Sequence, residues 1–145
     1  MSVRAKDVAA YILHRQGSMP AMKLQKLVYY SLAWSLVWDD KPLFEETIEA
    51  WANGPVIREL YDAHRGQFSV SSIPDGAPDR LNTDQRETVD AVLQFYGDKS
   101  SQWLSDLTHT EAPWRDAREE NGLDSGERGQ APITHASLHE YYSAL

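Results

Sequence analysis

Cysteine is absent from the 145-residue sequence, which excludes disulfides, thiolate nucleophiles and zinc sites that need sulfur ligands. Its absence suits a reducing compartment, so we expect a cytoplasmic protein. Long apolar runs are also lacking, because the uncharged run that ends at Trp38 is well short of the ~20 residues that span a bilayer. The first residues carry charges where an export signal would be apolar. We therefore expect neither export nor membrane association.

Basic residues are few relative to acidic ones, with 14 Lys and Arg against 22 Asp and Glu, so the net charge is -8. Such a field repels phosphate backbones and attracts basic surfaces, which predicts a protein partner and no direct nucleic-acid ligand. Acidic residues are concentrated between two predicted helices, near solvent, at Asp39, Asp40, Glu45, Glu46 and Glu49. This segment is either a solvated surface or, in the sharper interpretation, the binding site for a basic partner.

Helical spacing of apolar residues recurs along most of the chain. It predicts helices over 5–16, over about 21–38 and from the Asn53-Gly54-Pro55 turn to Gly66. It also predicts helices from a cap at Asn82 or Thr83 to Gly97, from a cap within 98–101 to Pro113, and from Thr134 onward. A short turn follows Pro113, residues 121–132 are predicted to be a mobile loop, and minor β elements are predicted at about 47–51 and 68–73.

The predicted architecture is a mainly α, compact fold of about six helices around a central apolar helix at about 21–38. No repeat or linker interrupts it, so we expect a single domain over residues 1–145. Aromatic residues are abundant, with five tryptophans and seven tyrosines, and these residue types dominate both cores and interface hot spots. Core packing is the expectation for Trp34, Trp51, Trp103 and Trp114, which have apolar sequence neighbours.

The sequence contains residue types that can act in catalysis or metal binding, but no complete catalytic or metal-binding motif. His135 and His139 have the i, i+4 spacing of two metal ligands without a third. His109 could pair with Glu111 or Asp106, yet no activated nucleophile accompanies it. The 53–55 turn lacks the glycine pattern and lysine of a phosphate loop. We therefore predict no enzyme and no catalytic, metal or cofactor site.

Several short motifs occur in an order that resembles the Panacea domain family. They are residues 23–30 (Lys-Leu-Gln-Lys-Leu-Val-Tyr-Tyr), 42–44 (Pro-Leu-Phe) and 48–56 (Ile-Glu-Ala-Trp-Ala-Asn-Gly-Pro-Val), followed by Leu60-Tyr61, Leu107-Thr108-His109, Pro113-Trp114, Ile133, Leu138, Tyr141 and Tyr142. The resemblance runs from about residue 5 to the carboxyl end, and motifs in the correct order are more specific than any single one.

This resemblance implies a domain found in antitoxins of two-gene toxin–antitoxin systems and in phage-associated proteins, whose members neutralise different toxins by direct contact. The family has no established active site, so its signature positions are expected to be structural in this chain. These positions are Lys23, Lys26, Trp51, Gly54, Pro55, Val56, Tyr61, His109, Pro113 and Trp114.

The leading hypothesis is an antitoxin without chemistry of its own that binds a toxin encoded beside it, as a hetero-oligomer or with self-association. We expect no operator binding by this protein alone. One alternative within the binding class is a proteolytic adaptor that delivers a toxin to a protease. The rival from another class is a small hydrolase that uses His109 and nearby carboxylates.

Overall fold

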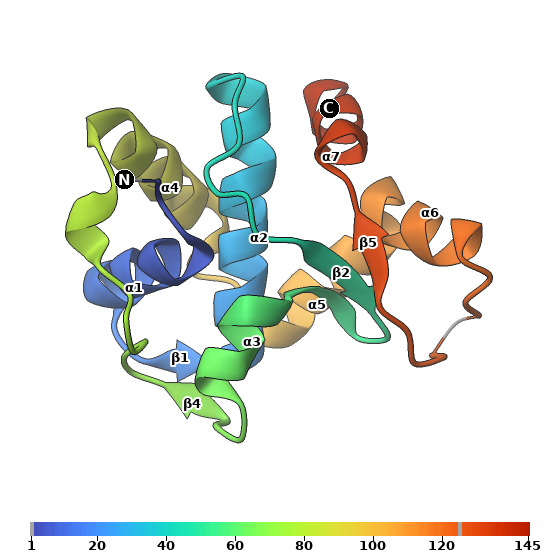
Figure 1. The fold of residues 1–145 in the computed structure, drawn as a ribbon, viewed down its shortest axis with the longest axis horizontal. Coiled ribbons are helices and arrows are strands. Elements are labelled where there is room, and N and C mark those ends of the chain that lie inside the picture. Colours follow the sequence, from blue (N-terminus) through green and yellow to red (C-terminus); the bar gives the residue numbers. More distant parts are fainter. Residues whose placement is uncertain (1, 125) are drawn as a thin grey trace.

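One helix is buried along most of its length at the centre of the molecule. The computed structural model describes residues 2–124 and 126–145, and in it α2 (Ala21–Trp38) passes through the middle of the fold (Figure 1). Residues 24–33 are all 0 % exposed. A helix that is apolar on every face must be covered on every face, so α2 determines where the other elements pack.

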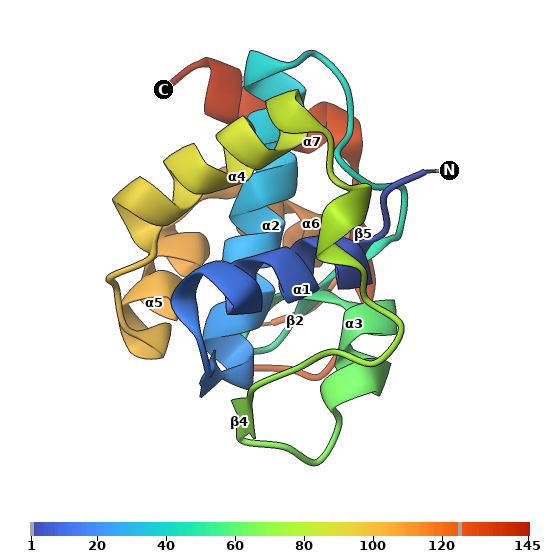
Figure 2. The ribbon, with the colours of Figure 1, turned by 90° about the vertical axis from the view of Figure 1, so that its left-hand side faces the viewer.

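The covering helices come from both halves of the chain, and Figure 2 shows two of them, α1 and α4, in front of α2. The fold is mainly α, as predicted, and residues 2–124 and 126–145 contain seven α-helices and one 3-10 helix rather than about six. Besides α2 these are α1 (Ala5–Gln16), α3 (Arg58–His64), η1 (Pro78–Arg80), α4 (Thr83–Tyr96), α5 (Ser101–Thr110), α6 (Ala112–Glu120) and α7 (His135–Ser143). The additional helix is α6, which we had expected to be a short turn.

A small antiparallel sheet lies beside α2, with strand order β3-β2-β5. It consists of β2 (Ile48–Trp51), β3 (Gly54–Ile57) and β5 (Ala131–Ile133). The first two strands form a hairpin in which Trp51 pairs with Gly54, and β5 joins the other edge of β2. A second pair, β1 (Met19–Pro20) with β4 (Ser69–Val70), lies at the start of α2. The expected β elements are therefore present, the second reduced to two residues.

The predicted start of the third helix is wrong, because Asn53-Gly54-Pro55 turns a hairpin and α3 begins only at Arg58. Gly54 has φ +129°, which no right-handed helix uses. Pro55 is compatible with an edge strand, where a missing N–H breaks no ladder bond. The side chain of Gln25 ends the strand by accepting from Ile57 N at 2.9 Å and donating to Ile57 O at 3.3 Å.

The predicted mobile loop over 121–132 is also partly wrong, since its last residues belong to β5. The preceding segment is held by the buried guanidinium of Arg118, which donates to the carbonyls of Ala50, Asp124 and Glu127. One buried cation thus holds Asp124 and Glu127 in a region whose local sequence, rich in glycine and charge, indicates no structure.

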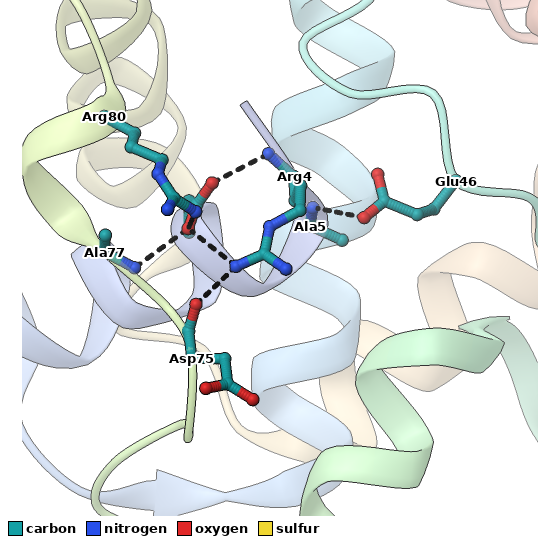
Figure 3. A network of polar contacts seen from close by, with 7 residues as sticks. Arg4, Ala5, Glu46, Asp75, Ala77 and Arg80 are labelled. Carbon is teal, nitrogen blue, oxygen red and sulfur yellow. Dashed lines mark hydrogen bonds and ion pairs between the residues drawn. The ribbon is translucent and has the colours of Figure 1, made fainter. Parts of the chain in front are cut away.

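A second polar network joins the start of α1 to the segment before α4 (Figure 3). The buried carboxylate of Asp7 accepts from Arg4 N at 2.9 Å, from Ala77 N at 2.8 Å and from Arg80 Nη1 at 3.3 Å. Both carboxylate oxygens therefore have donors, which is what a buried charge requires. The network fixes the covering layer on one side of α2.

Candidate partner-binding site

The acidic segment that sequence analysis proposed for a basic partner is divided among several elements. Asp39 accepts from Thr88 Oγ1 of α4 at 2.6 Å, and Glu46 accepts from Ala5 N at the start of α1 at 3.1 Å (Figure 3). Both side chains therefore help to hold helices in place. The role of Asp39 and Glu46 in partner binding remains a prediction. Their hydrogen bonds show that they also have a structural role.

The remaining three acidic residues differ in exposure. Glu49 is partly buried, accepts from the indole Nε1 of Trp51 at 2.7 Å and lies 3.8 Å from Arg58. Asp40 and Glu45 are exposed, and Asp40 lies 3.8 Å from His139 Nε2. Asp40 and Glu45 are thus the members of the segment whose position best suits contact with a partner.

Several signature positions meet around the tip of the β2–β3 hairpin. A Cβ placed on Gly54 would lie 2.7 Å from Lys26 Cε and 3.3 Å from Thr108 Oγ1, so α2, the hairpin and α5 touch at this glycine. Next to it the His109 ring stacks on the indole of Trp114, with centroids 4.1 Å apart, and Trp114 Nε1 donates to Trp51 O at 2.7 Å. These contacts join α2, the hairpin, α5 and α6, and the structural role of the signature positions stays a prediction.

Lys26 is the unusual member of this junction because its side chain is fully buried. Its Nζ has no hydrogen-bond partner among the described residues. Burial lowers the pKa of Lys26 from 10.5 to about 8, since desolvation disfavours the ammonium form. That difference corresponds to about 3 kcal/mol of destabilisation of the charged form at neutral pH. The surroundings of Lys26 in the junction therefore disfavour the charged form of its amine.

Two adjoining surface recesses lie beside the junction and share Met22, Asn53 and Tyr61. The larger, about 910 Å³, is lined by a polar stripe of α5 formed by Ser101, Ser105 and His109. The smaller, about 630 Å³, is lined by signature residues of the hairpin and α3, together with residues 128–130. Signature positions thus reach the surface here as well as the interior.

The surroundings of His109 bear on the hydrolase hypothesis. None of the hydrogen bonds in the described part of the chain joins His109 to a serine or a carboxylate, and its Nε2 is buried without a partner there. Glu111, the partner considered for His109, instead binds two tyrosines. Within residues 2–124 and 126–145 no cluster of three His, Asp or Glu side chains could hold a metal ion.

Glu111 belongs to a buried tyrosine cluster that the sequence did not reveal. Its Oε1 accepts from Tyr30 OH and from Tyr142 OH, each at 2.7 Å, and Tyr142 OH lies 3.1 Å from Tyr29 OH. Burial raises the pKa of Glu111, and the two tyrosine hydrogen bonds oppose this rise. The cluster joins α2, α7 and the start of α6, so α7 is attached to the core partly by polar contacts.

An aromatic groove lies at the far end of α2 from the hairpin. The groove, about 460 Å³, is bounded by Trp38 of α2 and Phe95 of α4, which are 51 % and 64 % exposed. No sequence motif assigns Trp38 or Phe95 to a binding site. Trp103, expected in the core, is instead 42 % exposed and lies under the ammonium of Lys99. Phe95 lies off the buried stripe of α4, which consists of Val89, Val92, Leu93 and Tyr96 together with Thr88.

Comparison with known proteins gives one family match. The model for the antitoxin SocA-like Panacea domain matches residues 24–115, more than half of the chain. No match is found among curated proteins or solved structures. The matched region contains the junction around Gly54 and the aromatic groove. No helix of the described residues is long and apolar enough to cross a membrane.

Gly54→Ala should lower the free energy of unfolding by about 2–3 kcal/mol, because the left-handed φ and the contact with Lys26 both oppose a Cβ. The Lys26 side chain cannot swing away, since it is fully buried. The matched control is Gly17→Ala, where φ is +81° and nothing lies within 4 Å of the new Cβ. Chemical denaturation should show a clearly smaller loss for the control, and equal losses would contradict the packing argument.

Glu111→Gln should change how stability depends on pH. The folded-state pKa of Glu111 is raised, so its contribution is fully present below the ordinary carboxyl pKa of 4.5 and is lost as pH rises through the folded value. Gln keeps an oxygen that accepts from both tyrosines but does not titrate. The stability of wild type relative to Glu111→Gln should therefore fall from acidic to neutral pH in denaturation curves. A pH-independent difference would show that Glu111 titrates normally.

Proposed function

This chain belongs to the antitoxin SocA-like Panacea domain family, and from that premise we propose that it is an antitoxin that neutralises a toxin encoded beside it by direct protein–protein contact. The family match carries the proposal. We further propose that it acts in the cytoplasm, within a two-gene system that phages can carry, and that it has no enzymatic activity.

Three properties of the molecule support a binding role. The net charge of -8 favours encounter with a basic protein. Large aromatic side chains remain exposed on its surface, as at many protein interfaces. His109, the histidine of the hydrolase hypothesis, is stacked on Trp114, and among the described residues no hydrogen bond joins it to a serine or a carboxylate.

Co-expression with the adjacent gene tests this function. The adjacent product alone should arrest growth, and co-expression of this chain should restore growth and yield a complex of the two proteins on purification. Rescue without a physical complex would contradict direct neutralisation.

The proteolytic adaptor is distinguished by repeating the rescue in a strain that lacks the candidate protease. An occluding antitoxin should rescue growth equally well there, with the toxin still present at full abundance by immunoblot. Rescue that disappears in that strain, together with protease-dependent loss of the toxin in the parent strain, would establish the adaptor instead.

A further inference from the structure

The aromatic groove between α2 and α4 has walls that are already fixed in place. Trp38 stacks on Trp34 with ring centroids 5.0 Å apart, and Trp34 Nε1 donates to Tyr96 OH at 3.1 Å. Tyr96 stacks in turn on the buried ring of Tyr30, and Phe95 packs edge-on against Tyr96 at 4.7 Å. Because rigid aromatic rings lose little conformational entropy on binding, these exposed walls are suited to hold a partner's apolar side chains.

Acidic residues flank the groove residues in the sequence of α2 and α4. Asp39 and Asp40 directly follow Trp38, Glu87 precedes the groove residue Ala91 by one helical turn, and Asp98 follows Phe95 by three residues. Two lysines are also near in sequence, Lys41 and Lys99, and Lys99 is 3.8 Å from Asp98 and over the Trp103 ring. Of these six charged residues that flank the groove in sequence, which we call its rim, four are acidic and two are basic.

The charge pattern identifies the kind of occupant. A second copy of this chain, also at -8, would bring like charge against the acidic rim. A partner segment with apolar side chains on one face and Lys or Arg beside them would fill the groove and neutralise the rim. An amphipathic helix laid in an apolar groove is a recurrent way of meeting both requirements.

We propose that this groove is the docking site for a basic amphipathic helix of the partner protein, with apolar side chains inserted between Trp38 and Phe95. The identity of that partner as a toxin rests on the function proposed above. The affinity of the groove for a basic amphipathic helix does not rest on that function, so the groove proposal and the antitoxin proposal can be tested separately.

The first test uses a synthetic helical peptide of leucine and lysine, and a second in which glutamate replaces lysine. Calorimetry should show that the lysine peptide binds the wild-type chain, more weakly at high salt, and that the glutamate peptide does not. Phe95→Ser should weaken binding of the lysine peptide about tenfold or more. The matched control is Phe68→Ser, which removes an 84 % exposed aromatic whose carbonyl accepts from Ala21 N at the opposite end of α2.

Unchanged melting temperatures would show that both variants fold. Equal binding by wild type and Phe95→Ser, binding of both peptides alike, or no binding of the lysine peptide would each overturn the groove proposal. Trp38→Ser provides a second variant on the other wall.

The second test uses the product of the adjacent gene. If it binds the wild-type chain and Phe95→Ser weakens the complex while Phe68→Ser does not, both proposals are supported. If it binds both variants as tightly as wild type, the groove proposal fails and the antitoxin proposal stands. If it does not bind the wild-type chain, the antitoxin proposal fails, and the peptide experiment still decides the chemistry of the groove.

Discussion

Complete burial of α2 is the constraint on which the rest of this structure depends. Ten consecutive residues of the helix are removed from water, so every polar side chain among them must find a partner inside the protein. Gln25 does so by ending the β3 strand, and Tyr30 by binding the carboxyl group of Glu111. Polar groups of the central helix thus position the hairpin on one side and α6 and α7 on the other. Lys26 is the exception, because its Nζ has no hydrogen-bond partner among the described residues. Its lowered pKa reflects the unfavourable desolvation of the ammonium group.

Local pattern predicted the long helices and the first strand of the sheet, but not α6, the start of α3 or the strands β3 and β5. α1, α2 and α4 follow from apolar periodicity and caps, and they end at or close to the predicted residues. β3 was predicted wrongly as the start of a helix because a glycine followed by proline suits a helix start and an edge strand equally well. β5 was missed because its position depends on pairing with β2 and on Arg118, both distant in sequence.

The candidate site was predictable only in part for the same reason. The family motifs identified Gly54, His109 and Trp114, and the structure brings these residues together with Lys26 at one junction. The acidic segment was seen as one solvated stretch, whereas the structure uses Asp39 and Glu46 to hold neighbouring helices. The aromatic groove depends on how two helices cross, and no sequence motif marks it.

The core around α2 and its junction maintains the fold, and the proposed contact with a partner lies on an exposed surface near the end of α2. Hydrogen exchange of the chain, free and bound to the product of the adjacent gene, tests this division most directly. The account predicts unchanged, slow exchange in the buried part of α2 and new protection in α4 around residues 91–96. New protection at the hairpin tip and along α5, with α4 unchanged, would contradict it and would place the contact at the recesses beside Gly54.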